Sequence, residues 1–178
     1  MAILSSRKIH YLLYTARNGA TTTEQGKSLE DLVCYIFGKI PGISITHRDQ
    51  LNIFRSEEID VALWNEKRSQ VLDFLPNVIL VEAKNWSNPI SSSEVAWFDR
   101  KLQNRGLDFG ILVAVRGITG NAEERTSAHQ IIAQSLVDRR RIVILTADDI
   151  ITLRDTASLV TLVKTRLCEL AVTGTLFP

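Results

Sequence analysis

Hydrophobic residues near the start of the chain recur three and four positions apart, which is the spacing of one face of a helix. This pattern predicts a first helix over residues 3–18, which would end before Asn18-Gly19. A second helix is expected to follow Thr21 and to stop near Pro41-Gly42. Thr21 and Glu24 have the spacing of a capping box, in which two side chains satisfy free backbone N–H groups of the first turn.

The rest of the chain alternates between short apolar runs, typical of buried strands, and segments with helical spacing. Ser91 and Glu94 offer a second capping box at the start of one such helix, and Gly106 is a stop signal beyond its end. The expected strands are residues 43–54, 57–65, 78–84, 109–115 and 141–145, the first two joined around Arg55-Ser56. The expected helices are residues 91–104, 122–137 and 148–171, the last of them broken near Asp155.

The order of these elements indicates the fold class. Strands joined by short connections favour antiparallel pairing, whereas strands separated by a helix favour parallel pairing. The chain is therefore expected to be an α/β protein in which a central mixed β-sheet is flanked by helices, with the core order αβββαβαβα. We expect a single domain (1–178) made of an N-terminal helix extension (1–20), a core (21–146) and C-terminal helices (147–178).

The composition adds few constraints. Hydrophobic residues make up 45% and charged residues 23% of the 178 residues, which is ordinary for a globular protein. Lys and Arg total 21 against 20 Asp and Glu, so binding to nucleic acid would depend on a local patch of charge. Cys34 and Cys168 lack metal-ligand spacing and have apolar neighbours, which predicts core thiols of a reducing compartment. Because no secretory segment and no apolar run of membrane-spanning length is found, we expect a cytoplasmic protein without a membrane partner.

The strand expected over residues 78–84 ends in two opposite charges. Glu82 and Lys84 are two residues apart, and because side chains alternate across a strand they point to the same face. Burying isolated charges costs several kcal/mol, so such a pair needs partners or a function. A structural ion pair at the end of the strand is the simplest explanation of these two residues alone.

A carboxylate in the preceding strand is expected close to this pair. Alternation places Asp60 on one face of that strand and its apolar neighbours Ile59, Val61 and Leu63 on the other. Consecutive strands usually pair, so Asp60 should lie near Glu82, and two carboxylates on neighbouring strands can share a divalent cation. Taken alone, Asp60 is explained more simply as a turn cap or a solvent-exposed residue.

A third carboxylate lies on the second helix. At about 100° per residue, Glu30 falls at the edge of the apolar stripe, beside Phe37. Asp31 points nearly opposite, into solvent. Glu30 therefore leans toward whatever this helix packs on, although a Glu at the edge of a stripe is often only a surface residue.

Together these motifs resemble the PD-(D/E)xK nuclease superfamily. Glu30 on a first helix, Asp60 on one strand and Glu82-x-Lys84 on the next stand in the order of that superfamily. The segments EEIDVALWN and VILVEAKNW are similar to the Mrr-type restriction endonuclease and nuclease-related-domain branches. The resemblance covers residues 21–116, and Ile59 stands in place of the Pro of the family name, a departure that similar branches tolerate.

The resemblance implies a Mg²⁺-dependent endonuclease of restriction-endonuclease-like fold that hydrolyses phosphodiester bonds, in DNA above all. Asp60, Glu82 and the backbone carbonyl of Ala83 would hold one or two Mg²⁺ ions, with Mn²⁺ as a substitute, and Glu30 would complete the shell. The metal would activate a water molecule. Lys84 would orient or deprotonate that water and neutralise charge that develops on the phosphate.

Further residues of the helix at 91–104 are candidates for contact with nucleic acid. Similar nucleases place a Gln on this helix facing the site, which makes Gln103 a candidate, although a solvated position is the simpler explanation. Lys101 and Arg105 are four residues apart on or beside this helix and could meet phosphates.

Residues after the two central strands are also candidates. Asn85 and Trp86 directly follow the expected strand at 78–84 and could border a substrate groove, Trp86 by stacking on a base. A Trp is more often a packing residue. Arg116 ends the next strand and could face the same groove, although a surface role is the simpler explanation.

The sequence leaves the partners open. Many similar nucleases are homodimers, and without a recognisable target-recognition or ATPase module, sequence specificity would need a partner subunit. Two alternatives to a DNA endonuclease remain: a catalytically idle nucleic-acid-binding or structural subunit of a larger complex, and a nuclease acting on RNA or branched DNA. An apolar stripe near the C-terminus could supply a dimer interface or be buried in the core, and it consists of Leu159, Val163, Leu167 and Leu170.

Overall fold

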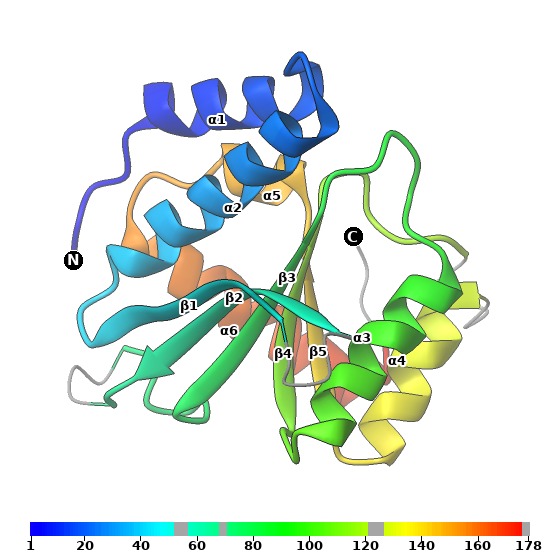
Figure 1. Cartoon of the computed structure of the whole chain (residues 1–178). Helices are drawn as coiled ribbons and strands as arrows, with labels where there is room; N and C mark the ends of the chain where they lie inside the picture. The colour runs from blue at the N-terminus through cyan, green and yellow to red at the C-terminus, as the bar shows by residue number, and fades with distance from the viewer. Residues whose placement is uncertain (52–56, 68–70, 121–126, 176–178) are drawn as a thin grey trace.

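Five strands form one mixed sheet with helices packed on both of its faces (Figure 1). The computed structural model describes residues 1–51, 57–67, 71–120 and 127–175. The strands are β1 (Ile43–Leu51), β2 (Glu58–Asn65), β3 (Val78–Lys84), β4 (Phe109–Ala114) and β5 (Arg141–Leu145). The helices are α1 (Ser6–Asn18), α2 (Thr22–Gly38), α3 (Ser92–Asn104), α4 (Ser127–Val137), α5 (Ala147–Ile151) and α6 (Thr156–Thr173).

The strands lie in chain order, β1-β2-β3-β4-β5. The first three pair antiparallel, because their short connections return the chain directly to the neighbouring position. The pairs β3–β4 and β4–β5 are parallel, because α3 and α4 carry the chain back to the same end of the sheet. The expected α/β class, the element order and the mixed pairing are therefore confirmed.

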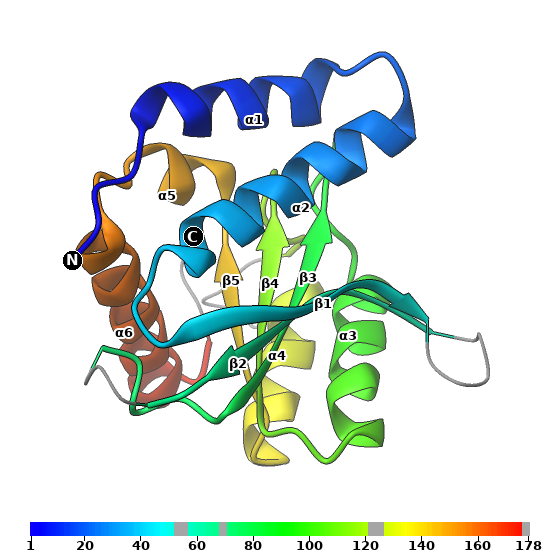
Figure 2. The ribbon, with the colours of Figure 1, turned by 60° about the vertical axis from the view of Figure 1, so that its left-hand side comes forward.

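Each face of the sheet has its own hydrophobic core. Helices α1, α2, α5 and α6 cover one face, and α3 and α4 cover the other (Figures 1 and 2). Along β3, Val81 packs into the first core, whereas its neighbour Leu80 packs into the second with Phe98 of α3. This alternation continues to the end of the strand, so Glu82 and Lys84 lie on the α3 side and Ala83 on the α2 side.

Strand β2 departs from simple alternation at its beginning. Val61 and Leu63 pack on the α2 side, as expected, but Ile59 packs with the residues of the α3 side. The expectation that Ile59 shares their face is therefore wrong. The backbone pairing of β2 with β3 extends only from Trp64–Val78 to Val61–Val81. The residues of β2 before Val61 are therefore not held in register by β3.

The capping patterns placed the starts of α2 and α3 correctly, but only the first of them forms a side-chain capping hydrogen bond. Thr21 caps α2, since its hydroxyl accepts a hydrogen bond from the Glu24 N–H at 3.1 Å. The second capping box is wrong: the Ser91 side chain makes no capping hydrogen bond, and its hydroxyl instead pairs with that of Ser93. Glu94 lies 3.7 Å from the Lys84 Nζ instead, because an ammonium attracts a carboxylate more strongly than a backbone N–H does.

The expected break near Asp155 is confirmed, since this residue caps α6 by accepting a hydrogen bond from the Ser158 N–H at 2.8 Å. The expected turn at Arg55-Ser56, the strand end at 52–54 and the helix start at 122–126 lie outside the described residues. In the described ranges, no helix combines the length and the hydrophobicity that crossing a membrane requires.

The C-terminal stripe is part of the core. Leu159, Val163 and Leu170 are at most 1% exposed and Leu167 is half-buried, so the stripe is used for packing inside the chain. Cys168, on the opposite side of α6, is exposed, which contradicts the expectation of a core thiol. Cys34 is half-buried and its burial raises the pKa of the thiol.

Candidate active site

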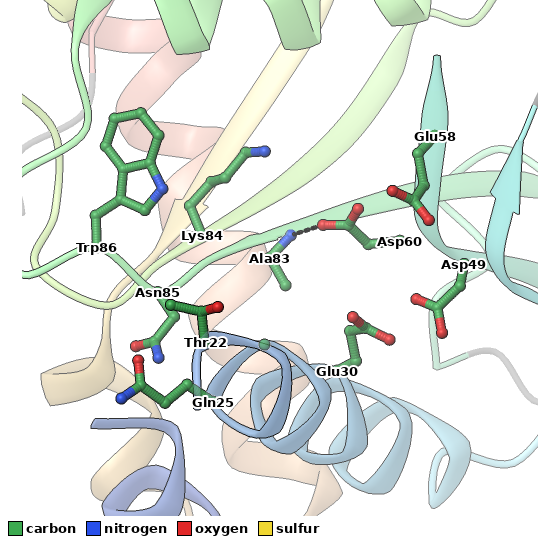
Figure 3. Close-up of a pocket in the computed structure, with 11 residues that line it drawn as sticks. Thr22, Gln25, Glu30, Asp49, Glu58, Asp60, Ala83, Lys84, Asn85 and Trp86 are labelled. Carbon is green, nitrogen blue, oxygen red and sulfur yellow. Dashed lines mark hydrogen bonds between the residues drawn. The ribbon is translucent and has the colours of Figure 1, made fainter. Parts of the chain in front are cut away.

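The end of the β2–β3 ladder creates the centre of the site. Where a further backbone pair would form, Asp60 Oδ2 accepts a hydrogen bond from the Ala83 N–H at 2.7 Å. The N–H and C=O of one strand residue point to the same side of the strand, so the Ala83 carbonyl also faces β2. The Asp60 carboxylate, whose hydrogen bond to the Ala83 N–H Figure 3 shows, and this backbone carbonyl thus lie where the two strands separate.

A pocket of about 350 Å³ opens at this point between α2, β1, β2 and the end of β3. Glu30 reaches it from α2 and is 15% exposed, whereas its neighbour Asp31 is 43% exposed and pairs with Arg48. The predicted difference in exposure is therefore confirmed, but the two side chains do not point in opposite directions, since both approach Arg48 Nη2. Four carboxylates line one end of the pocket, as Figure 3 shows: Glu30, Asp49, Glu58 and Asp60.

The negative charges in this pocket are poorly compensated. Burial and the neighbouring Asp49 and Asp60 raise the pKa of Glu30 to about 8. Burial and the charge of Glu82 raise the pKa of Asp60 to about 6, against the opposing effect of the Ala83 N–H. Glu30 Oε2 is buried without a hydrogen-bond partner in the part of the chain that the structure describes, and Arg48 Nη2 lies 3.6 Å from it. The pocket therefore favours a cation.

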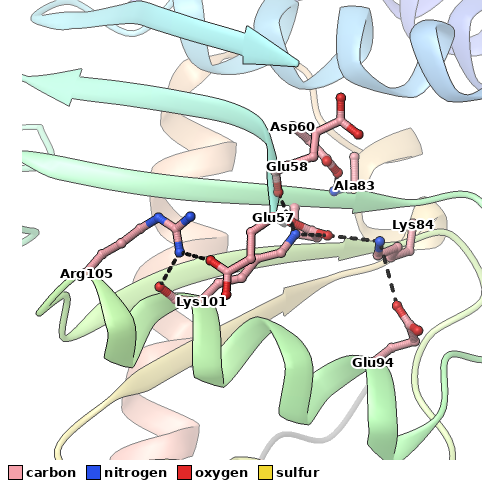
Figure 4. Close-up of polar contacts among 9 residues, drawn as sticks. Glu57, Glu58, Asp60, Ala83, Lys84, Glu94, Lys101 and Arg105 are labelled. Carbon is pink, nitrogen blue, oxygen red and sulfur yellow. Dashed lines mark hydrogen bonds and ion pairs between the residues drawn. The ribbon is translucent and has the colours of Figure 1, made fainter. Parts of the chain in front are cut away.

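On the other side of β3, Glu82 has the opposite surroundings. It is 2% exposed, and both of its oxygens accept hydrogen bonds from Lys101 Nζ, at 2.8 and 2.7 Å (Figure 4). Lys84 Nζ lies 2.9 Å from Glu82 Oε1, which confirms that these two side chains share a face. Lys101 also donates to the Glu58 carbonyl at 2.7 Å. Two ammonium groups thus surround one buried carboxylate.

Lys84 stands between these two environments. It lines the carboxylate pocket and also pairs with Glu82 and Glu94. Burial, the largest single influence, lowers the pKa of Lys84, but the nearby Glu82, Asp60 and Glu94 outweigh it and raise the pKa above its ordinary value. Its ammonium is therefore held by Glu82 and Glu94 in a residue that borders the pocket.

This arrangement agrees with a comparison against known families. The family model Mrr_cat, described as a restriction endonuclease, matches residues 22–146. The chain belongs to this restriction endonuclease family. In sequence comparisons no curated protein matches it. The matched range contains all four residues Glu30, Asp60, Glu82 and Lys84, whereas α1 and α6 lie outside it.

Restriction endonuclease-like domains generally use divalent metal ions. The chemistry of the pocket fits such an ion, because hard carboxylate and carbonyl oxygens surround it and the buried Glu30 Oε2 lacks a hydrogen-bond partner among the described residues. Across residues 1–51, 57–67, 71–120 and 127–175, however, no three carboxylate, imidazole or thiol side chains are arranged to hold a metal ion. The expected set is incomplete because Glu82 turns toward Lys101 and Lys84.

Lys101 and Arg105, which were expected to meet phosphates, are both paired with carboxylates of the chain. Lys101 is 3% exposed and bound to Glu82, so its ammonium is unavailable to a ligand. Arg105 Nη1 lies 2.6 Å from Glu57 Oε2, and the guanidinium lowers the pKa of that carboxyl. Gln103 is exposed and does not line the carboxylate pocket. Lys101 of the same helix contacts Glu82 on the other side of β3.

Asn85 and Trp86 do lie beside the pocket, at the end opposite the carboxylates (Figure 3). Trp86 is 46% exposed, so it is a rim residue rather than a core residue. The Asn85 amide donates to the Ala16 carbonyl and thereby fastens the end of α1 to the end of β3. Arg116 is exposed and lines a neighbouring hollow, which Asn85 and Trp86 also line.

Two pocket residues, Asp49 and Glu58, were not expected from the sequence. Asp49 stands in β1 with a positive φ of 49°, a conformation in which Asp is commoner than most residues. A charged residue in the interior of a strand was the available signal. Glu58 stands two residues before Asp60, a spacing that places both side chains on one side of a regular strand.

Proposed function

We propose that this chain is a Mg²⁺-dependent endonuclease that hydrolyses phosphodiester bonds in DNA. The observation that carries the proposal is the pocket in which Glu30, Asp60 and Ala83 meet beside the ammonium of Lys84. Burial and neighbouring carboxylates raise the pKa of Glu30 to about 8 and that of Asp60 to about 6, so a bound cation would stabilise the ionised form of both groups. Membership of a restriction endonuclease family supports the same chemistry.

Glu30, Asp60 and the Ala83 carbonyl would hold the ion, with Glu82 joining them if it leaves Lys101. When bound, Mg²⁺ would supply a water molecule of lowered pKa and polarise the phosphate. Asp60 is kept in place by the Ala83 N–H, which stabilises its ionised form and orients its second oxygen toward the pocket. Glu30 and Asp60 come from different elements, so the packing of α2 on the sheet sets their separation.

Lys84 would act directly on the substrate. Its ammonium lies 2.9 Å from Glu82 and at the wall of the carboxylate pocket, so it can reach both an attacking water and a non-bridging phosphate oxygen. A fixed positive charge at that point neutralises the charge that develops as water attacks the phosphorus. Glu82 and Glu94 hold the lysine from the other side and limit its rotamers.

The nearly balanced charge of the chain, 21 basic against 20 acidic residues, implies weak binding of DNA that falls steeply with salt. Sequence specificity would then come from a homodimer or from a recognition or ATPase subunit. A homodimer would place two copies of the site on the two antiparallel strands of a duplex.

The direct test is cleavage of supercoiled plasmid DNA by the purified protein with Mg²⁺, with Mn²⁺ and with EDTA. Glu82→Ala and Lys84→Ala should remove cleavage while leaving the circular dichroism spectrum unchanged. Linear duplex, single-stranded DNA, branched DNA and RNA in the same assay identify the substrate. Absence of cleavage of every substrate at high protein concentration would overturn the proposal.

A second candidate is a subunit that binds nucleic acid without cleaving it. The Lys101–Glu82 contact favours this alternative, because a carboxylate already neutralised by two ammonium groups has less need of a metal ion. Mg²⁺ titration followed by calorimetry separates the two functions. Binding that Asp60→Asn removes supports the nuclease, and absence of any Mg²⁺ binding supports the idle subunit.

A further inference from the structure

A second hollow adjoins the carboxylate pocket and differs from it in chemistry. It has a volume of about 120 Å³ and shares Gln25, Asn85 and Trp86 with the carboxylate pocket. Its other lining residues include Arg17 and Arg116, and none of the described residues that line it is a carboxylate. The hydrogen-bond donors of this hollow and the exposed indole of Trp86 therefore lie next to the pocket that the carboxylates and Lys84 line.

The hollow continues past the two arginines toward the start of α5. Arg17 and Arg116 also line this next part, together with Thr146 and Asp148. Asp149 is engaged there by Arg166 at 2.9 Å, whereas Asp148 is exposed. Asp148 and Asp149 thus lie at the end of the hollow away from the carboxylate pocket. The part of the hollow that is rich in hydrogen-bond donors lies between these two acidic residues and that pocket.

Both arginines are available to a ligand. Arg17 and Arg116 are exposed, and neither side chain has a hydrogen bond or an ion pair within the described ranges. Other arginines that approach the sheet are already paired, such as Arg105 with Glu57. Arg17 stands in the last turn of α1, so its positive charge also complements the helix dipole. This interaction does not occupy the hydrogen-bond donors of the guanidinium.

The position of Arg17 is fixed relative to the carboxylate pocket by two hydrogen bonds. The Asn85 amide donates to the carbonyl of Ala16, the residue before Arg17. The Gln25 amide donates to the Gly19 carbonyl at 2.8 Å and ties the following turn to α2. Asn85 and Gln25 also line both hollows, so the same side chains shape the groove and hold the arginine beside it.

We propose that Arg17 and Arg116 form a phosphate-binding subsite that holds the DNA backbone next to the cleaved phosphodiester, with Trp86 against the nucleotide between them. This inference rests on the proposed nuclease function. Guanidinium groups bind phosphate oxygens in pairs of hydrogen bonds, and an exposed indole offers a face on which a base can stack. Arg17 lies outside the range matched by the family model, so this part of the subsite belongs to the N-terminal helix.

The test is binding of a short fluorescein-labelled DNA duplex, followed by anisotropy in EDTA so that no metal-dependent cleavage occurs. Arg17→Ala and Arg116→Ala should each weaken binding about tenfold and reduce the slope of log K against log salt by about 1. Arg7→Ala is the matched control, because Arg7 is an exposed arginine of the same helix far from the groove, and it should leave affinity and slope unchanged. With Mg²⁺, the two groove variants should raise KM and leave kcat unchanged.

The outcome separates the subsite from the nuclease function. Wild-type affinity and salt slope in both groove variants would overturn the subsite, even if Asp60→Asn abolishes cleavage. Weakened binding in these variants, without cleavage of any substrate by the wild type, would support the subsite and overturn the nuclease. Equal weakening by Arg7→Ala would show a general effect of charge and would also overturn the subsite.

Discussion

The carboxylates on the two sides of strand β3 have opposite electrostatic surroundings. On the α3 side, Glu82 is 2% exposed and contacts Lys101 and Lys84 within 3 Å. On the α2 side, Glu30 and Asp60 have other carboxylates as their near neighbours, and the pKa of each is raised. On the α3 side two ammonium groups contact one carboxylate, whereas on the α2 side Arg48 and Lys84 offset several neighbouring carboxylates only in part (Figures 3 and 4).

This difference indicates where a bound metal ion would stabilise the carboxylates most. A buried carboxylate that already has two ammonium partners gains little from a metal ion and must first give up a partner. Carboxylates that repel one another gain from the ion directly, because it replaces protons or relieves repulsion. We therefore expect the ion on the Glu30–Asp60 side and a mainly positioning role for Lys101. The following changes test this contrast, beginning with the largest effect.

Removing the charge of Asp60 should have the largest consequence. Asp60→Asn keeps the size of the side chain but removes the carboxylate between Ala83 and the pocket. We expect plasmid cleavage to slow about 1,000-fold, equivalent to about 4 kcal/mol of activation free energy. The control is Asp31→Asn, which removes an exposed charge from α2 and should change the rate less than about twofold. Equal damage by both variants would remove the distinction between pocket and surface carboxylates.

Removing Lys101 should destabilise the protein. Lys101→Met leaves the buried Glu82 with Lys84 as its remaining ammonium contact, and we expect the free energy of unfolding to fall by about 3 kcal/mol. Urea denaturation measures this change. The double variant Lys101→Met with Glu82→Gln removes the unpaired charge as well and should recover part of the loss. Strictly additive losses would show that the two side chains are not coupled.

Adding Mg²⁺ should stabilise the folded protein through the pocket. At a concentration about ten times its dissociation constant, the ion adds about 1.4 kcal/mol to the free energy of unfolding. Thermal unfolding at pH 8 with and without Mg²⁺ measures this gain. Asp60→Asn should show little of it, whereas Lys101→Met should retain it. A gain that survives in Asp60→Asn would place the ion elsewhere on the chain.

Neutralising Glu30 should have the smallest effect and a defined pH dependence. The pKa of Glu30 is raised from 4.5 to about 8, so the folded state binds a proton more readily than the unfolded state does. The contribution of Glu30 to the free energy of unfolding is fully present below pH 4.5 and is lost as the pH rises to about 8. Glu30→Gln should therefore stabilise the metal-free protein by on the order of 1 kcal/mol at pH 8. At pH 4 it should have little effect.

Urea denaturation across this range of pH checks the sign. Glu24→Gln is a suitable comparison, because Glu24 is an exposed carboxylate of the same helix whose charge lies outside the pocket. A loss of stability in Glu30→Gln at pH 8 would mean that the ionised Glu30 is well compensated, and the contrast between the two sides of β3 would no longer hold.

Much of the fold was predictable because its signals are local. The spacing of apolar residues identified every described helix and strand, and the break at Asp155 followed from the same pattern. The different exposure of Glu30 and Asp31 followed from helix geometry alone. The face of Ile59 and the burial of Cys168 were predicted wrongly, and so were two contacts between distant segments. Glu94 contacts Lys84 rather than its own helix, and Lys101 contacts Glu82 rather than solvent.

The amino-acid sequence fixes which chemical groups are present, and side-chain periodicity assigned most of them to a face of their helix or strand; at the start of β2 this failed, since Ile59 packs on the α3 side and Asp60 lines the pocket beside α2. Only the tertiary structure decided which carboxylates receive ammonium partners from within the chain. The reason is that a periodic pattern records position along one element, whereas charge compensation depends on distances between elements. Lys101 and Glu82 are 19 positions apart, and the packing of α3 against β3 brings them to 2.7 Å. The packing of α2 on the sheet brings Glu30 and Asp60 together on the other side, in the pocket proposed to bind the cation.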